Sequence, residues 1–376
     1  MNSPELSKKI QSEIKKRRTF AIISHPDAGK TTLTEKLLLY AGLLRTAGMV
    51  RGRKAHAQVS SDWMKMEQDR GISITASAMQ FEYKGAVINV LDTPGHQDFS
   101  EDTYRTLTAA DSAVMVIDAA KGIETQTRKL FEVCRLRGIP ILTFINKMDM
   151  PAEDPYELVA EVEKVLGIDA TPINWPIGMG KGFRGVADCA SGEVILFERG
   201  EHVGSDKATA RKLSQDEVSQ VHFNLELLAE AGNTFSLDRF LSGESTPVFF
   251  GSALTNFGVE PFFDAFCELA PAPFARPVTT DSGEERLIDP AEEPFSAYVF
   301  KMQANMDKRH RDSMAFLRVC SGRFERDLGV KHARSPKEIR LSRSHSMFGG
   351  ERTTVESAYP GDIVGVVNPG VFTIGD

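Results

Sequence analysis

The chain has 376 residues, of which 41% are hydrophobic and 26% are charged, as is ordinary for a globular protein. This length suggests two or three domains, and no apolar run approaches the roughly 20 residues that a membrane span needs. The polar start Met1–Ile10 is no secretory signal, and the four cysteines include no C-x-x-C pair. We therefore expect a cytoplasmic location without membrane contact, with inert thiols rather than disulfides.

Charge is spread unevenly along the chain. The formal net charge is −7, yet residues 301–352 hold 13 basic and 6 acidic side chains, whereas residues 151–250 hold 8 basic and 17 acidic ones. A protein of this kind can turn one face to nucleic acid and keep another face away from it. Charge alone leaves open the alternative of two solvated faces that bind nothing.

Helix and strand patterns alternate over the first 150 residues. A helix over residues 5–18 ends in the run Lys15–Arg18, which we expect to be a solvated face or a helix C-terminal charge cluster, with contact to RNA phosphate as an open alternative. The following pattern predicts strands at 19–23, 76–83, 86–91, 113–118 and 140–145, and helices at 31–39, 100–109 and 125–137. Such alternation predicts a parallel sheet covered on both faces, which binds ligands at the carboxyl ends of its strands.

The pattern changes after residue 150. An acidic stretch at about 150–245 is interpreted as an insertion, after which a strand at 246–250 and a helix at 259–269 resume the sheet. The proline-rich run 271–277 indicates a linker, and short alternating runs beyond it predict a β-barrel. We therefore expect an α/β domain with an inserted subdomain over residues 1–277 and an all-β barrel domain over residues 278–376.

An octet between the first strand and the following helix matches a phosphate-binding loop, G-x-x-x-x-G-K-[ST], except that Ser24 stands at the first glycine. Backbone N–H groups of such a loop and the helix N-terminus hold a polyphosphate, Lys30 reaches the outer phosphates and Thr31 ligates Mg²⁺. His25 is expected to be structural rather than catalytic. The predicted phosphate-binding residues are Ser24, His25, Pro26, Asp27, Ala28, Gly29, Lys30, Thr31 and Thr32.

A second motif, Asp92-Thr93-Pro94-Gly95-His96, follows the apolar strand 86–91. Asp92 is placed to hold Mg²⁺ through water, the Gly95 N–H to sense the terminal phosphate, and His96 to orient an attacking water. The nucleotide-binding set therefore also includes Asp92, Thr93, Pro94 and Gly95.

A third motif, Asn146-Lys147-Met148-Asp149, follows the strand 140–145 and predicts guanine specificity. Guanine presents two N–H groups that one carboxylate accepts together, whereas adenine presents an acceptor at the ring position, so Asp149 favours guanine. We expect Lys147 to lie over the base, Asn146 to brace the phosphate loop, and Ser252-Ala253 to add backbone contact to the guanine oxygen.

A loop at 70–73 is predicted to close over the Mg²⁺–phosphate group, with the Ser73 hydroxyl as a metal ligand beside Thr31 and Asp92. Thr75 competes with Ser73 for this role. A solvent-exposed strand start, with no role in binding, stays open at this position.

These motifs resemble those of the translational GTPases, and within them the peptide-chain release factor three family. Ser24 fits that family better than elongation factor G, which has glycine there. Family members continue past the barrel, so the chain is expected to be truncated. The stretches that carry the resemblance are 17–31, 61–67, 92–96, 98–105, 300–306 and 310–312.

The resemblance implies a ribosome-dependent GTPase that binds GTP or GDP with Mg²⁺, uses His96 in catalysis and drives codon-reading release factors off the ribosome. It also implies a monovalent cation near Asp27 and an apolar gate of Pro26 and Ile72 around His96. The insertion would meet the ribosomal stalk, and residues 301–352 would meet ribosomal RNA. A monomer is expected.

Two alternatives stay open. One is another translational GTPase, either elongation factor G-like or of the ribosome-protection type. The other is a non-catalytic guanine-nucleotide sensor, which would show no GTP hydrolysis with or without ribosomes.

Overall fold

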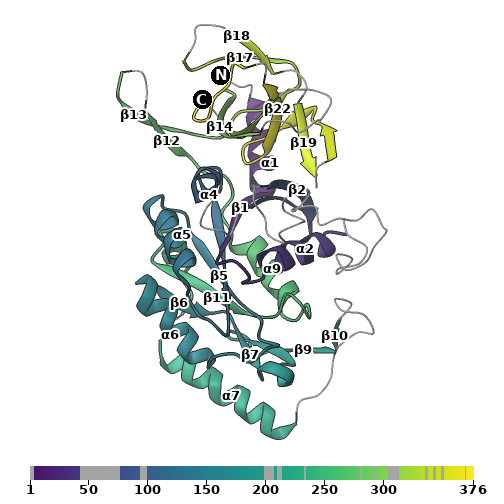
Figure 1. Ribbon diagram of the computed structural model, residues 1–376, viewed down its shortest axis with the longest axis vertical. Coiled ribbons are helices and arrows are strands. Elements are labelled where there is room, and N and C mark those ends of the chain that lie inside the picture. The colour runs from purple at the N-terminus through teal and green to yellow at the C-terminus, as the bar shows by residue number, and fades with distance from the viewer. Residues whose placement is uncertain are drawn as a thin grey trace.

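The computed structural model describes residues 4–42, 77–93, 100–198, 207–209, 214–232, 234–279, 282–291, 294–303, 313–334, 338–341, 344–348, 351–368 and 370–376. These residues form an α/β body and a β-rich body joined end to end (Figure 1). The fold is a P-loop α/β domain followed by a β-barrel domain, as the sequence predicts.

Seven strands form the central sheet, in the order β2-β3-β1-β4-β5-β11-β6. β2 is antiparallel to β3, and all the other pairs are parallel. The inner strands are continuous apolar runs because helices cover both of their faces. The strands are β1 (Arg17–Ser24), β2 (Ser77–Tyr83), β3 (Ala86–Asp92), β4 (Ser112–Asp118), β5 (Ile141–Asn146), β6 (Asp169–Pro172) and β11 (Ser245–Phe250).

Alternate residues of β1 point into two separate cores. Phe20 and Ile22 pack beneath α2 (Lys30–Tyr40), α8 (Leu237–Leu241) and α9 (Val259–Leu269), whereas Ala21 and Ile23 face the opposite layer. That layer consists of α4 (Ser100–Leu107), α5 (Thr125–Leu136) and α6 (Pro155–Leu166). The helices lie on either side of the sheet in Figure 1, so most residues of the inner strands are buried whichever way they point.

The stretch 150–245, expected as one insertion, contributes to the main layers before it leaves them. α6 buries Leu158, Val162 and Leu166 against the sheet, and β6 pairs in parallel with β11. The acidic composition of this stretch concealed the helix and strand that belong to the main layers. The acidic residues of α6 lie beside its buried apolar stripe and do not interrupt it. Outside the main layers lie α7 (Gln215–Glu230), the short helix η2 (Gly180–Gly182) and the antiparallel sheet of β7 (Asn174–Ile177), β8 (Gly185–Asp188), β9 (Val194–Glu198) and β10 (Lys207–Thr209).

The first helix ends earlier than predicted. α1 covers Pro4–Lys16, and the next two arginines open β1. The expected solvated cluster was therefore wrong at Arg17, which is 6% exposed and donates from Nε to Asp362 Oδ1 at 2.9 Å. Burial alone would lower the pKa of Arg17, but Asp362 and Glu13 raise it above its ordinary value. A basic run at the end of a helix stays solvated only where its side chains have no buried acidic partner elsewhere in the chain.

The β-rich body is built on a five-stranded sheet in the order β14-β15-β22-β19-β20. Its core is a cluster that includes Val299, Leu317, Phe324 and Val364. A hairpin of β12 (Arg276–Thr279) and β13 (Glu285–Ile288) links the two bodies. The remaining strands are β14 (Ser296–Gln303), β15 (Ser313–Ser321), β16 (Phe324–Glu325), β17 (Leu328–Lys331), β18 (Glu338–Leu341), β19 (Ser344–Phe348), β20 (Glu351–Thr354), β21 (Ser357–Ala358) and β22 (Ile363–Asn368).

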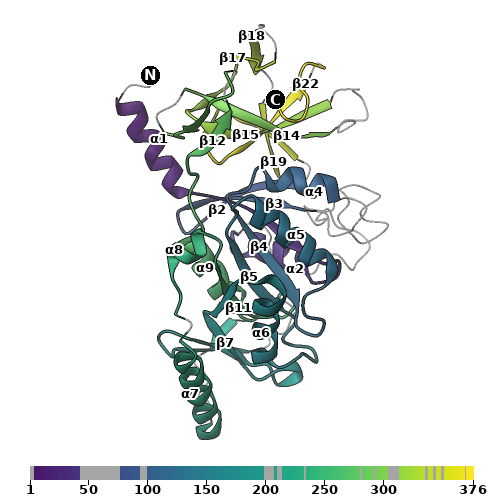
Figure 2. The same ribbon diagram turned by 90° about the vertical axis from the view of Figure 1, so that its left-hand side faces the viewer.

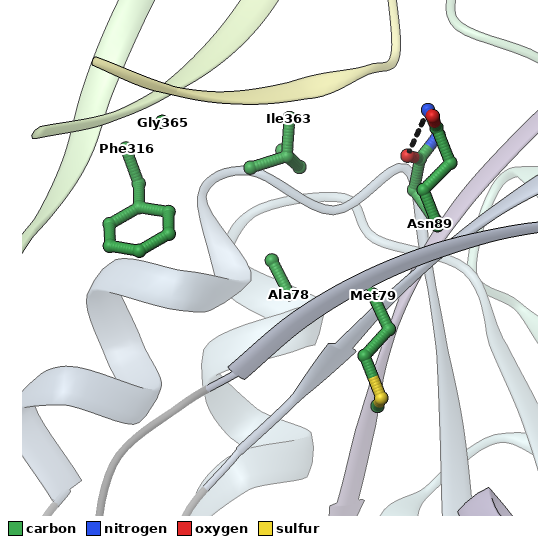
Figure 3. Close-up of a pocket in the computed structure, with 7 residues that line it drawn as sticks. Ala78, Met79, Asn89, Phe316, Ile363 and Gly365 are labelled. Carbon is green, nitrogen blue, oxygen red and sulfur yellow. Dashed lines mark hydrogen bonds between the residues drawn. The ribbon is translucent and has the colours of Figure 1, made fainter. Parts of the chain in front are cut away.

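Buried polar groups hold the two bodies together. Asp362 Oδ1, just before β22, accepts from Arg17 and from Gln80 Nε2 at 2.8 Å. Gln80 also donates to Asn89 at 3.0 Å, the bond drawn in Figure 3 beside a cavity of about 10 Å³. Figure 3 also shows Ile363 above Ala78. The sheet edge formed by β2 and β3 is therefore bonded directly to the second body.

A second buried cluster lies where α4 runs into β4. Arg318 of β15 donates from Nη2 to both oxygens of Asp111, at 3.0 and 2.8 Å. Arg276 of β12 donates to the same carboxylate at 2.9 Å and to the carbonyls of Thr108 and Ala110. Arg318 therefore adds no charge to the surface, although it belongs to the basic segment 301–352.

α1 lies along the side of this junction (Figure 2). Ile10 and Ile14 are buried against Ala291 and Tyr359, so the first helix packs against residues of the linker and the barrel. No helix in the described part of the chain is long and apolar enough to cross a membrane.

The four cysteines are free thiols. Burial raises the pKa of Cys134, Cys189 and Cys267 to about 12, and it also raises the pKa of Cys320. These thiols are therefore protonated at neutral pH, and protonated thiols are poor nucleophiles.

Candidate functional site

The predicted motifs converge at one edge of the central sheet. The register places Ile22 beside Asp92, and Asp118 beside Asn146. Because these strands are parallel, the segments that follow β1, β3, β4, β5 and β11 all leave from the same edge. We call this the carboxyl edge.

The phosphate loop is a tight turn that only glycine can complete. Gly29 has φ 96° and immediately precedes α2, whose Leu33 N–H bonds to the Gly29 carbonyl at 2.9 Å. A Cβ atom on Gly29 would lie 2.2 Å from Asn146 Nδ2. Asp27 also has a positive φ, of 66°. Both the backbone conformation and the space therefore require glycine at position 29.

Asn146 joins three of the converging segments. Its Nδ2 donates to the Ala28 carbonyl at 2.8 Å, and its Oδ1 accepts from the Ala253 N–H at 2.8 Å. Asn146 ends β5 and is 2% exposed. One buried amide thus fixes the phosphate loop relative to the segments after β5 and β11, and it does brace the phosphate loop as the sequence predicts.

Lys30, at the start of α2, and Asp92, at the end of β3, form a buried ion pair beside the phosphate loop. Lys30 Nζ lies 2.9 Å from Asp92 Oδ1, and both side chains are almost fully enclosed. The hydroxyl of Thr93 donates to the Ile22 carbonyl and ties the end of β3 to β1. The Ser24 hydroxyl is buried and meets no hydrogen-bond partner among the described residues.

His25 is tied to the start of α5. Its N–H donates to Thr127 Oγ1 at 3.0 Å, and its Nε2 lies 3.3 Å from Glu124 Oε1. Neither Thr127 nor Glu124 was singled out from the sequence. These contacts tie the phosphate loop to α5, in addition to its bond with Asn146.

The Asn146–Asp149 segment holds a carboxylate oxygen that has no hydrogen-bond partner among the described residues. This atom, Asp149 Oδ1, is buried. Met148 is fully buried, and its N–H donates to the Gly251 carbonyl at 3.1 Å. Lys147 has φ 70°, and its Nζ lies 2.7 Å from Asp118 Oδ2. The segment is therefore rigidly anchored while one carboxylate oxygen stays available.

Comparison with known proteins identifies the family. Residues 15–272 match the model for the elongation factor Tu GTP binding domain, and residues 294–376 match elongation factor G domain 2. The chain is 58% identical to peptide chain release factor 3 of Gloeobacter violaceus, covering 100% of this chain and 71% of that protein. It is 55% identical to the protein of the same name from Symbiobacterium thermophilum, covering 98% of this chain and 70% of that one.

The chain belongs to the peptide chain release factor 3 family. It is therefore a GTPase of translation termination, and this assignment is favoured over an elongation factor G-like protein or a nucleotide sensor. A solved chain from Thermus thermophilus shares the fold, with a TM-score of 0.77 at 23% identity, covering 96% of this chain and 54% of that one.

The structure places most of the residues that the release factor 3 motifs predict at the carboxyl edge. Ser252 and Ala253 follow β11 and are buried there, with the Ser252 N–H bonded to the Phe257 carbonyl at 2.8 Å. Pro26, Asp27, Thr31 and Thr32 lie in or just after the phosphate loop. The predictions on Ile72, Ser73, Thr75, Pro94, Gly95 and His96 concern residues outside the described ranges.

Sequence reasoning on this release factor 3 homologue missed Asp118. It ends β4 at the same edge, and both its carboxylate oxygens have partners. Its place at the end of an apolar run was visible in the sequence, but its pairing with Lys147 was not. No known motif drew attention to it.

Proposed function

We propose that the carboxyl edge is the guanine-nucleotide site of this translational GTPase, with the residues in the roles that follow. The observation that carries this proposal is the pair of hydrogen bonds made by Asn146. Those bonds hold the phosphate loop and the base-recognition segment in a fixed relation, as one ligand that spans both would require.

The phosphate end of the site fits a polyphosphate with Mg²⁺. The left-handed backbone at Gly29 and the N-terminus of α2 turn N–H groups into the loop. Lys30 would bind phosphate oxygens, and Thr31, Asp92 and Ser73 would hold Mg²⁺, which supplies positive charge to the phosphates. The buried Lys30–Asp92 pair supports this, because each member keeps a counter-charge in the absence of nucleotide.

The base end of the site fits guanine. A buried carboxylate oxygen without a partner costs about 1–3 kcal/mol, which a ligand with paired N–H groups would recover. We expect Asp149→Asn to reduce the preference for GTP over ATP, measured as the ratio of their dissociation constants. A ratio equal to that of the unaltered protein would contradict the assignment.

We propose His96 as the catalytic residue that orients the attacking water once the ribosome has ordered it. Intrinsic hydrolysis should then be slow. His96→Ala should keep its affinity for GTP and lose ribosome-stimulated phosphate release, while Glu132→Ala, which breaks an exposed pair with Arg135 on α5, serves as the control. Stimulated turnover that survives in His96→Ala would remove this residue from the mechanism.

We propose that the partners on the ribosome are the codon-reading release factors, which this protein drives off after peptide release. The basic segment 301–352 would face ribosomal RNA, and the acidic unit around α7 would face the ribosomal stalk. The test adds this chain and GTP to post-release ribosomes and follows departure of a fluorescent release factor. Departure that is no faster than with GTP omitted would overturn the proposal.

Three smaller assignments complete the proposal. The domain boundary lies at residue 277, between the α/β domain and the barrel domain, and the inserted unit within the first domain starts after β6. Asp27 holds a monovalent cation near the phosphates. The protein acts as a monomer, which analytical ultracentrifugation would test.

A further inference from the structure

Lys147 is fixed at both of its ends. Its backbone adopts φ 70°, a left-handed conformation that residues with a side chain rarely take, and its carbonyl accepts the Met150 N–H at 2.9 Å. At the far end, Nζ donates to Asp118 Oδ2 at 2.7 Å. The methylene stem between these anchors is therefore confined to one path, and it stays partly exposed at the carboxyl edge.

Asp118 is itself rigidly held. Its side chain is 4% exposed, and its Oδ1 accepts the Ala120 N–H at 3.0 Å while Oδ2 accepts Lys147. Its carbonyl accepts the N–H groups of Lys121 and Gly122, at 3.0 and 2.9 Å. The carboxylate therefore has little freedom to move, and it can dictate where the ammonium group of Lys147 lies.

The aspartates of this edge differ in what they face. Both oxygens of Asp118 have partners within the chain, whereas Oδ1 of Asp149 has none among the described residues. Asp118 is thus suited to arranging another side chain, and Asp149 is suited to receiving a ligand. If both carboxylates lacked partners within the chain, they would compete for the same N–H groups of the ligand.

We propose that Asp118 is a positioning residue for the base, holding Lys147 so that its methylene stem forms one wall of the guanine site beside Asp149. This inference rests on the proposed function, in which the segment Asn146–Asp149 binds guanine. A stem that is already ordered loses little side-chain entropy when nucleotide binds, and this pre-organisation strengthens binding.

The methylene stem of Lys147 and the carboxylate of Asp149 would contact different parts of the base, and they would therefore contribute differently to base selectivity. A methylene stem contacts the face of a purine, which guanine and hypoxanthine share. Asp149 contacts the edge, where guanine has an exocyclic amine that hypoxanthine lacks. Loss of the Asp118–Lys147 pair should therefore weaken GDP and inosine diphosphate by the same factor, about five- to tenfold from the mobility that one lysine regains.

The experiment measures dissociation constants of GDP, inosine diphosphate and ADP by competition with a fluorescent GDP analogue, using the full chain. Asp118→Asn keeps an acceptor for the Ala120 N–H but removes the charge that holds Lys147. Lys147→Met keeps an apolar stem and removes the ammonium, without touching the turn at Asp118. The matched control is Asp169→Asn, which breaks the ion pair with Arg239 at the start of β6, away from the carboxyl edge.

Each single variant should weaken both GDP and inosine diphosphate five- to tenfold, and the double variant should be no weaker than either one. The control should bind like the unaltered protein. Three results would overturn the inference: Lys147→Met that binds like the unaltered protein, unchanged binding in folded Asp118→Asn, or an Asp118→Asn loss that persists in full in the Lys147→Met background.

Failure of the proposed function has a different signature. In that case, Asp149→Asn would leave the ratio of GDP to ADP affinity unchanged, whatever the Asp118 variants do. Should Asp118→Asn not fold, Lys147→Met still decides the matter, because its side chain is partly exposed and it leaves the Asp118 turn intact.

Discussion

The interface between the two bodies and the carboxyl edge both bury polar groups, but they differ in whether those groups have hydrogen-bond partners within the chain. At the interface, Asp111 is wholly enclosed, and both of its oxygens are bonded to arginine. At the carboxyl edge, the hydroxyl of Ser24 and Oδ1 of Asp149 are equally enclosed and have no partner among the described residues.

This difference reflects what else can reach each place. An unpartnered buried polar group costs about 1–3 kcal/mol, which a ligand that bonds to the group would recover. The interface is closed and must satisfy its charges internally. The carboxyl edge leaves donors and acceptors free for a ligand, at some expense in the stability of the empty protein.

Removal of a charge from the closed interface should have the largest effect on stability. Asp111→Ala leaves Arg318 and Arg276 without their carboxylate, and we expect a loss of about 3–5 kcal/mol in the free energy of unfolding. Urea unfolding followed by circular dichroism measures it. The control is Glu132→Ala, which breaks an exposed pair with Arg135 and should cost no more than about 0.5 kcal/mol. Equal losses in the two variants would refute the comparison.

A milder change at the same interface should give an intermediate effect. Asp362→Asn removes the charge that faces Arg17 while retaining a polar group near Gln80. We expect a loss of about 1.5–3 kcal/mol, as for hydrogen bonds to charged groups. Thermal unfolding monitored by calorimetry would reveal it. A midpoint that does not move would mean that the interface tolerates an unpaired Arg17.

At the carboxyl edge, Gly29→Ala should affect binding more than stability. The left-handed φ alone costs about 1–2 kcal/mol, and the new Cβ would displace Asn146. The matched control is Gly42→Ala, because Gly42 has φ 74° but no atom within 4 Å of its Cβ position. Calorimetric titration with GDP should show a large loss of affinity in Gly29→Ala only. Comparable affinity in the two variants would show that the contact with Asn146 is dispensable.

Two hydroxyls on β1 should give the smallest and sharpest contrast. Thr19 donates to the Gly361 carbonyl at 2.8 Å at the interface end, so Thr19→Val should cost about 1 kcal/mol. Ser24 has no partner among the described residues at the other end, so Ser24→Ala should stabilise the nucleotide-free protein, by about 1 kcal/mol. Chemical denaturation of the two variants in parallel decides this, and the reverse order would count against the comparison.

The sequence predicts the α/β body well, because each strand and helix there carries its own local signal. The helix predicted at 259–269 is α9 with the same bounds, and β4 differs from its prediction by one residue. The three motifs were placed at strand ends, and parallel pairing then brings strand ends together. Local periodicity and topology were sufficient for this part of the fold.

Contacts between distant residues escaped prediction. Arg318 and Asp111 are 207 positions apart, and the sequence around each residue gives no indication of the other. Composition misled at 150–245, where α6 and β6 belong to the main layers. Asp118 went unnoticed because its role depends on the pairing of β4 with β5 and on the backbone of Lys147. These features follow from tertiary structure, which single-sequence patterns do not encode.

The packing of α1 has a consequence for biosynthesis. α1 is synthesised before the residues it packs against: it buries Ile10 and Ile14 against Tyr359, and Arg17 pairs with a carboxylate 345 positions later. At a synthesis rate of roughly 5–20 residues per second, tens of seconds pass between the synthesis of α1 and Arg17 and the synthesis of their partners. Until the barrel is made, the nascent chain therefore exposes the apolar stripe of α1 that the finished protein buries.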